Sequence, residues 1–192
     1  MKTIIYFIRH GETVWNKTFR IQGRIDNLLS EEGKLQAVQA ANHIIETKID
    51  FDHIVTSPLT RALDTAKIIA STIGYTLDID IIKGLIERDF GKAEGLQLSK
   101  EVYEKMYAGD FEGIEQEKEL QERCYQTTLE IADKYPGKIV LATTHSHFIK
   151  GLFTQIDPNV FFTTSLKNGS FNIVEVENNT IKPIAFNQNN HL

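Results

Sequence analysis

Cysteine is almost absent from this 192-residue sequence, since Cys124 is its single thiol. One cysteine cannot form an internal disulfide framework and suits a reducing compartment, so we expect a cytoplasmic protein. Basic residues are also scarce relative to acidic ones: 21 lysines and arginines face 26 aspartates and glutamates, a net charge of −5. With this balance we expect neither nucleic acid nor an anionic membrane as the main partner.

Long apolar runs are missing as well. No stretch approaches the roughly 20 apolar residues of a membrane-spanning helix. The apolar run at the start ends at Arg9, short of the roughly 7–15 residues of a signal-peptide core, and no small-residue cleavage site follows. What is present is an ordinary globular composition, 41% hydrophobic and 24% charged. We therefore expect one soluble domain over residues 1–192.

Strand and helix patterns alternate along most of the chain. Continuous apolar or β-branched runs predict strands at 3–8, 52–57, 77–81 and 137–145, and a hairpin at 169–186 around Asn178 and Asn179. Helix-forming segments occupy 28–48, 57–74, 99–108, 116–134 and 148–156. This alternation predicts an α/β fold, with a sheet covered by helices on both faces.

Two helices carry more detailed expectations. In the first, Leu35, Val38 and Ile45 fall along one stripe that we expect to be buried. In the second, Ser57 is the expected N-cap, with Pro58 at the first helical position and a glycine at the end.

Cations and histidines stand at the ends of three predicted strands. The first strand ends in "IRHGET", the second in "TSPLTRA" and a later one in "TTHSHF". The carboxyl ends of strands in an α/β sheet meet at one crevice, which would collect Arg9, His10, Arg61 and His145. Forked guanidinium groups and helix amino termini favour a phosphate group. A histidine inside such a site indicates covalent catalysis at phosphorus.

A metal site is the competing interpretation, because His10, His145 and His147 could supply imidazole ligands. Two guanidinium groups would repel a divalent cation, and neither histidine motif contains an acid to offset them. We therefore expect no metal and no cofactor. For His147 we expect only a packing or hydrogen-bonding role at the start of the following helix.

Phosphoryl transfer also requires a proton donor for the departing oxygen, and a carboxyl group with a raised pKa suits that role. The segment "GLIERDFGKAEGL" contains three such groups in Glu87, Asp89 and Glu94. Spacing alone does not choose among these three.

The four motifs together resemble the histidine phosphatase superfamily, which includes cofactor-dependent phosphoglycerate mutases and many phosphatases. "RHGET" is similar to its nucleophile motif and "SPLTRALDTA" to its second-arginine motif, and "LIERDFGKAEG" and "TTHSHFI" are similar to its acid loop and second-histidine motif. The resemblance implies that His10 becomes phosphohistidine and that Glu87 is the general acid and base. Arg9, Arg61 and His145 would bind the phosphoryl group.

The stretch after the nucleophile, "WNKTFRIQGRIDNLLSEEG", is also similar to the family. The resemblance implies that Asn16 reaches the phosphate and that Gln22 and Gly23 line the substrate side. The implied fold is a three-layer α/β/α sandwich with a mostly parallel central sheet. Residues of about 91–122, hereafter the cap segment, would form a small helical cap.

Phosphatases and mutases of this family share the phosphohistidine step and differ in the acceptor of the phosphoryl group. The mutases hold an anionic bisphosphate with basic cap residues. Here residues 97–122 contain three lysines against eight acids, a net charge of −5, which favours a phosphatase. Arg88 points the other way, because an arginine at this position also occurs in the mutases.

The sequence therefore predicts a hydrolase that removes phosphate from small phosphorylated metabolites through a phosphohistidine, with broad specificity as one option. The alternatives are a 2,3-bisphosphoglycerate-dependent phosphoglycerate mutase and an inactive module that binds phosphorylated ligands. The expected partner is the phosphorylated substrate, and a homodimer is left open.

Overall fold

The computed structural model describes residues 1–192 in full. Six strands form one sheet: β1 (Thr3–Arg9), β2 (His53–Thr56), β3 (Ile79–Ile81), β4 (Ile139–Thr144), β5 (Phe171–Glu177) and β6 (Thr180–Gln188). Six α-helices accompany it: α1 (Val14–Lys17), α2 (Glu31–Thr47), α3 (Thr60–Ile73), α4 (Lys100–Ala108), α5 (Glu117–Lys134) and α6 (Ser146–Ile156). No helix is both long enough and apolar enough to cross a membrane.

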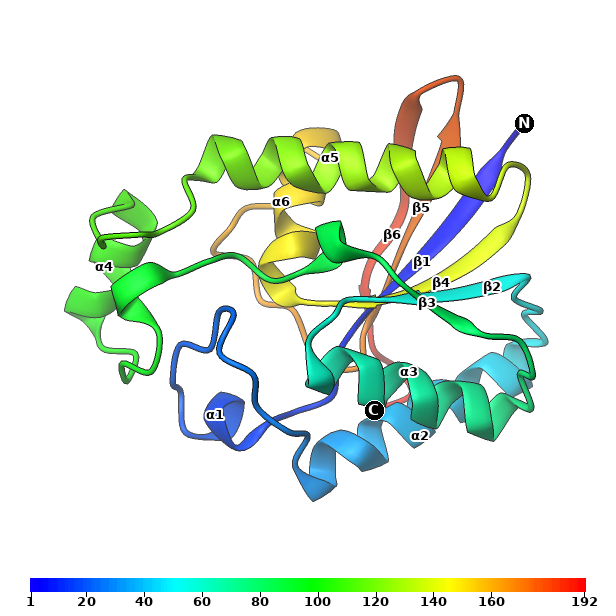
Figure 1. The fold of residues 1–192 in the computed structure, drawn as a ribbon, viewed down its shortest axis with the longest axis horizontal. Helices are drawn as coiled ribbons and strands as arrows, with labels where there is room; N and C mark the ends of the chain where they lie inside the picture. The colour runs from blue at the N-terminus through cyan, green and yellow to red at the C-terminus, as the bar shows by residue number, and fades with distance from the viewer.

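The sheet has the order β3-β2-β4-β1-β5-β6. The pairs β2–β3, β2–β4 and β1–β4 are parallel, whereas β5 is antiparallel to β1 and β6 is antiparallel to β5. Helices α2 and α3 cover one face and α5 and α6 the other, which gives three layers (Figure 1). The predicted three-layer α/β/α sandwich with a mostly parallel sheet is confirmed.

Side chains of β1 alternate between two cores, as the pleat of a strand requires. Ile5 and Phe7 pack under α5 and α6, whereas Ile8 belongs to the core under α2 and α3. Because β1 is a central strand buried on both faces, its carboxyl end is held firmly at the crevice where the parallel strands finish.

The predicted buried stripe of α2 was wrong. Leu35 and Ile45 are about half exposed, and the buried face consists of small residues with one isoleucine: Ala37, Ala40, Ala41 and Ile44. Small side chains let α2 pack closely against its neighbours. The true stripe therefore follows alanines, which a search for large apolar residues overlooks.

The predicted start of α3 was also wrong. This helix begins at Thr60, after Leu59, and no side chain of its own segment caps it. The cap comes instead from Asp26, which accepts hydrogen bonds from the backbone N–H and the hydroxyl of Thr60 at 2.9 and 2.5 Å. Ser57 is thereby free for another role, described below.

The cap segment leaves and rejoins the sandwich at one place, since its last residues, 117–122, already form the first turns of α5. Phe90 and Ile114 form an antiparallel bridge, and the backbone N–H of Glu115 donates to the Asp89 carbonyl at 2.8 Å. Between these points lies α4, which Figure 1 places beyond the same end of the sheet as α1. The two ends of the segment are thus fixed next to each other.

Candidate active site

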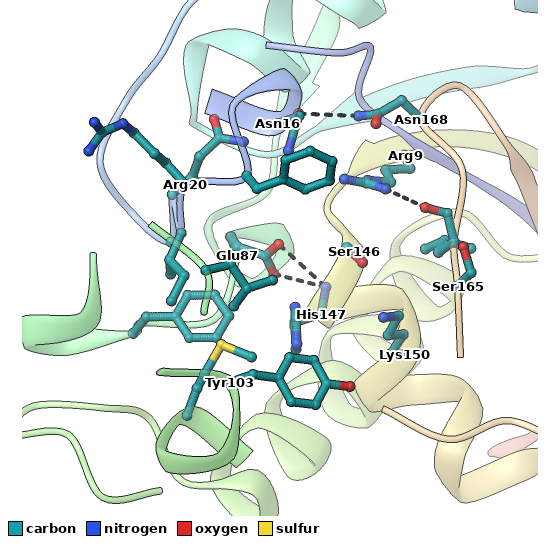
Figure 2. Close-up of a pocket in the computed structure, with 18 of the residues that line it drawn as sticks. Arg9, Asn16, Arg20, Glu87, Tyr103, Ser146, His147, Lys150, Ser165 and Asn168 are labelled. Carbon is teal, nitrogen blue, oxygen red and sulfur yellow. Dashed lines mark hydrogen bonds between the residues drawn. The ribbon is translucent and has the colours of Figure 1, made fainter. Parts of the chain in front are cut away.

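A cavity of about 450 Å³ lies at the carboxyl ends of β1 and β4. Its walls come from the β1–α1 region, the loop after β3, helix α4, the start of α6 and the loop at 163–168. Figure 2 shows Arg9, Glu87, His147 and Lys150 facing one another across it. Polar groups from segments far apart in the sequence therefore meet in one hollow, as the strand-end pattern predicted.

His10 is 3% exposed and follows the last residue of β1. Its Nδ1 lies 2.7 Å from the Gly11 carbonyl, which assigns the ring proton to Nδ1 and leaves Nε2 as a free lone pair. The start of α2 can approach this point closely because residue 11 is glycine. A Cβ at Gly11 would lie 2.1 Å from the carbonyl oxygen of Gly33, so any other residue would push α2 away from the site.

Arg61 Nε donates a hydrogen bond to the lone pair of His10 Nε2 at 3.2 Å. Two further hydrogen bonds hold this fork, from Nη2 to the Gly23 carbonyl at 2.7 Å and from Nη1 to the Ile25 carbonyl at 3.0 Å. The side chain is 1% exposed and lies on the first turn of α3. A buried guanidinium with fixed geometry stabilises charge that develops beside His10.

His145 lies behind His10, with the two ring centroids 5.1 Å apart. Its Nε2 is 2.7 Å from the hydroxyl of Ser57, which itself accepts a hydrogen bond from the backbone N–H of Leu59. The Ser57 hydroxyl retains its hydrogen and a second lone pair, so its contact with His145 Nε2 is compatible with a proton on either Nε2 or Nδ1 of His145. That buried Nδ1 has no partner within the protein.

Arg9 completes the group of donors. Its Nη1 donates to the carbonyl of Leu166, and its buried Nε has no partner in the protein. Buried donors are nearly always hydrogen-bonded, so an unpaired Nε beside the cavity indicates a ligand oxygen as its partner. Burial, together with neighbouring Arg61, lowers the pKa of Arg9 to about 10, so it still carries its charge at neutral pH.

Glu87 is the acid that faces this group. It is 6% exposed, and its Oε1 accepts hydrogen bonds from the backbone N–H groups of Arg88 at 2.9 Å and His147 at 3.1 Å. Asp89 and Glu94 do not line the cavity: Asp89 pairs with Arg24, and Glu94 accepts from the backbone of Arg24. Of the three acids that the sequence left open, only Glu87 therefore lines the cavity.

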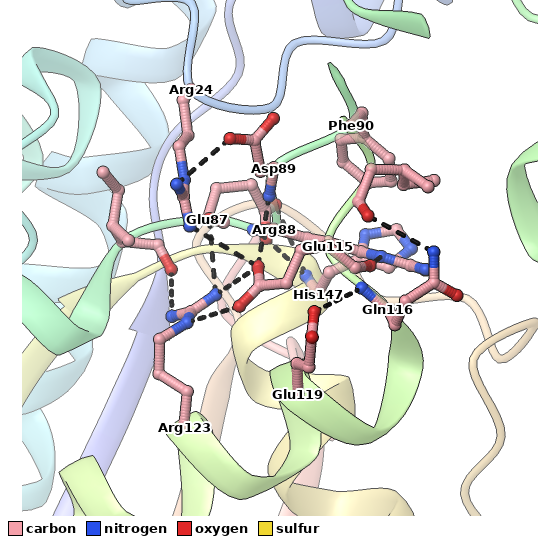
Figure 3. Close-up of polar contacts among 12 residues, drawn as sticks. Arg24, Glu87, Arg88, Asp89, Phe90, Glu115, Gln116, Glu119, Arg123 and His147 are labelled. Atoms are coloured by element: carbon pink, nitrogen blue, oxygen red, sulfur yellow. Dashed lines mark hydrogen bonds and ion pairs between the residues drawn. The ribbon is translucent and has the colours of Figure 1, made fainter. Parts of the chain in front are cut away.

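An arginine on α5 holds the acid loop in place (Figure 3). Arg123 binds both carboxylate oxygens of Glu115 at 2.8 Å and donates to the carbonyls of Gly84 and Ile86 at 2.7 and 2.8 Å. A bidentate pair with additional carbonyl partners is among the stronger polar contacts in proteins. The segment before Glu87 is therefore fixed to the sandwich.

The surroundings lower the pKa of His10 and raise the pKa of Glu87. Burial, with Arg61 and Arg9 nearby, holds the pKa of His10 well below its ordinary value of 6.5. Burial also raises the pKa of Glu87 above its ordinary value of 4.5, although its hydrogen bond and the two arginines oppose this shift. A neutral imidazole therefore lies beside a carboxyl group that retains its proton more readily than usual.

Comparison with known proteins identifies the family of this chain. The family model of the histidine phosphatase superfamily (branch 1) matches residues 5–189. The chain belongs to the histidine phosphatase superfamily.

Relatives within the superfamily include proteins named as phosphatases and proteins named as phosphoglycerate mutase-like. The chain is 33% identical to the uncharacterized phosphatase PhoE of Bacillus subtilis, covering 99% of this chain and 97% of that protein. It is 32% identical to phosphoglycerate mutase-like protein 4 of Arabidopsis thaliana, over 88% of this chain and 77% of that protein. A mutant phosphoserine phosphatase from Entamoeba histolytica, solved with phosphoserine, matches with a TM-score of 0.83, 28% identity and 99% coverage of both chains. These similarities support a phosphatase.

The remaining predicted positions of this superfamily member also meet at the cavity. Asn16, Gln22 and Gly23 line it. The Oε1 of buried Gln22 accepts from the Thr13 hydroxyl at 2.8 Å, which leaves its amide NH₂ as a donor. His145, by contrast, is fully buried, does not line the cavity and lies next to the ring of His10.

Sequence reasoning missed four residues of the site. His147 donates its backbone N–H to Glu87 near the start of α6, as the expected packing or hydrogen-bonding role allows, but its place on the cavity wall was not predicted. Ser57 orients His145, Lys150 lines the cavity, and Asn168 donates to the His10 carbonyl at 2.9 Å. Lys150 did carry a signal, as a lone cation within the apolar segment "FIKGLF", whereas Asn168 carried none.

Proposed function

We propose that this protein hydrolyses phosphomonoesters of small metabolites through a phosphohistidine at His10. The single observation that carries the proposal is the buried imidazole of His10, whose Nε2 accepts a hydrogen bond from Arg61 Nε at 3.2 Å in a cavity that also contains Glu87. A phosphoryl group there would have a nucleophile, cations and an acid within reach at once.

In the first step His10 Nε2 attacks phosphorus as the bond from phosphorus to the substrate oxygen breaks. Glu87 gives its proton to that oxygen, so the alcohol leaves neutral. Arg9 and Arg61 stabilise the charge on the three remaining oxygens of phosphorus. In the second step Glu87, now a carboxylate, takes a proton from water as the water oxygen attacks phosphorus. The bond to His10 breaks, which releases orthophosphate and restores both groups.

Arg88 gives little support to the mutase alternative. It is 1% exposed, its Nε donates to the Glu115 carbonyl at 2.9 Å, and its guanidinium lies 5.6 Å from the centre of the Phe90 ring. It is not part of the cavity wall. The acidic composition of residues 97–122 likewise supports hydrolysis over retention of a bisphosphate.

We expect the purified protein to hydrolyse p-nitrophenyl phosphate, followed as release of p-nitrophenol. We expect it to convert 3-phosphoglycerate to 2-phosphoglycerate slowly or not at all, even when primed with 2,3-bisphosphoglycerate. Primed interconversion faster than hydrolysis would favour the mutase. Binding of phosphate without turnover of any ester would favour the inactive module.

The pKa shifts predict an acid-shifted rate profile. Because the pKa of His10 lies well below 6.5, the attacking imidazole stays neutral when the pH falls through 6.5. Glu87 must be protonated, so kcat for an alkyl phosphate should fall as the pH rises through its raised pKa. Profiles for an alkyl phosphate and p-nitrophenyl phosphate, measured side by side, separate this alkaline limb from the ionisation of the phosphate. A limb equally steep for both esters would contradict the role of Glu87.

A further inference from the structure

A buried cation of the cavity takes no part in the chemistry described above. Lys150 lies on α6, one turn after His147, so both side chains project from the same side of the helix. The residue is 7% exposed and lines the cavity. Figure 2 shows it on the α6 wall together with His147, across the cavity from Arg20.

Lys150 has no acidic partner within the protein. It forms no salt bridge, and its Nζ makes one hydrogen bond, to the carbonyl of Phe162 at 2.9 Å. The same carbonyl accepts from the Tyr107 hydroxyl at 2.8 Å, so it is shared between two donors. An ammonium group has three N–H donors, which leaves two unused. A buried charge compensated by one neutral carbonyl is costly, which points to an anion as its missing partner.

The charges of the cavity are unbalanced in the same direction. Four cations line the cavity, but Arg20 is exposed to solvent and donates to the Gly95 carbonyl, which leaves Arg9, Arg61 and Lys150 as the three cations with little access to water. Glu87 is neutral when it acts as an acid. A phosphate dianion offsets two of them. One negative charge is still required, and a carboxylate supplies it with two oxygens for the two free donors of Lys150. A second phosphate dianion would need more donors than one point-charged ammonium offers.

We propose that Lys150 binds a carboxylate of the substrate, so that the preferred substrates are small phosphomonoesters that also carry a carboxylic acid. This inference rests on the proposed phosphatase function and adds a substrate class to it. Burial, with Arg9 nearby, lowers the pKa of Lys150 to about 8, so the free group is still mostly charged at neutral pH. A bound carboxylate would raise that pKa again.

O-phosphoserine and O-phosphoethanolamine differ only in the carboxylate and therefore test the proposal directly. We expect wild-type kcat/KM to favour O-phosphoserine by on the order of 10- to 100-fold, the usual range for a charge-assisted hydrogen bond. In Lys150→Met the preference should fall to about onefold through a higher KM for O-phosphoserine, and kcat/KM for O-phosphoethanolamine should change by a much smaller factor than kcat/KM for O-phosphoserine. Lys150→Arg should retain much of the preference.

Lys67→Met is the matched control, since Lys67 lies on the outer side of α3 with a largely exposed side chain. It should keep the wild-type preference. Lys150→Met removes a buried charge at similar length and is expected to fold, which thermal unfolding checks. If Lys150→Met does not fold, Lys150→Gln replaces it. The ratio of kcat/KM for O-phosphoserine to that for O-phosphoethanolamine in the wild type tests the proposal without any variant.

A wild-type ratio near one, or the same ratio in wild type and Lys150→Met, would overturn the carboxylate assignment while leaving the phosphatase proposal intact. Fructose 1,6-bisphosphate compared with fructose 6-phosphate tests the other anion. If Lys150→Met abolishes a preference for the bisphosphate instead, the group is a second phosphate and the assignment is wrong. No hydrolysis of any ester, p-nitrophenyl phosphate included, would overturn the phosphatase function and this inference with it.

Discussion

Replacing His10 with alanine is expected to lower kcat for p-nitrophenyl phosphate by roughly 10⁴-fold or more, the scale seen when a covalent nucleophile is removed. The reason is geometric. His10 Nε2 is held by the Nδ1 contact to Gly11 and faces Arg61, and no other imidazole nitrogen in the cavity has this position. Initial rates measured at saturating ester for wild type and variant give the ratio.

The same variant separates catalysis from binding. Arg9, Arg61 and His145 stay in place in His10→Ala, so orthophosphate should still bind, as isothermal titration can measure. Rapid acid-free quenching should trap a phosphorylated protein in the wild type and none in the variant. His43→Ala is the matched control, because its ring packs against Phe171 away from the cavity. Undiminished turnover in His10→Ala would refute the covalent mechanism.

Glu87→Gln has the second largest expected effect, and its size should depend on the leaving group. A positioned general acid contributes about 10²- to 10⁴-fold, so kcat for an alkyl phosphate should fall by that factor. Nitrophenolate leaves without a proton, so p-nitrophenyl phosphate should lose far less in the first step. A series of esters that differ in leaving-group pKa, measured in wild type and Glu87→Gln, gives the two slopes to compare.

Unfolding does not explain such a loss. The pKa of Glu87 is raised on folding, so its contribution to stability is fully present below the unfolded pKa and declines as the pH rises through the folded pKa. Removing the charge should therefore leave the free energy of unfolding unchanged or larger at neutral pH. Asp89→Asn is the control from the same loop, since Asp89 faces Arg24. A leaving-group dependence that appears in Asp89→Asn and not in Glu87→Gln would assign the acid to Asp89.

The positions of the main site residues could be predicted because the ends of the strands are marked in the sequence, where apolar runs stop at polar residues. A buried strand that finishes in "IRH" has one place to put Arg9 and His10, at the shared crevice. The α/β fold, with a sheet covered by helices on both faces, followed from the alternation of strands and helices, whereas the order of the strands in the sheet was not predicted. Local patterns were enough wherever one segment determines its own geometry.

Apart from the buried stripe of α2, the errors arose where distant segments decide the geometry. Asp26, 34 residues before Thr60 in the chain, caps α3, so the serine next to that helix was misread. Ser57 turned out to orient His145 from the neighbouring strand end. Lys150 stood out only as a lone cation in an apolar segment, and its place in the cavity did not follow from that signal, because its surroundings include Phe162 and Tyr107 from two other segments.

The joined base of the cap segment separates what this fold must conserve from what it can change. Phe90 and Ile114 meet in a bridge, and Arg123 secures Glu115 and the backbone before Glu87 from the sandwich side. Insertions or deletions between those two ends alter a closed loop, whose entropy grows slowly with length. Changes of length in this segment can therefore alter the cavity wall formed by α4, and with it the range of substrates, while Glu87 keeps its position.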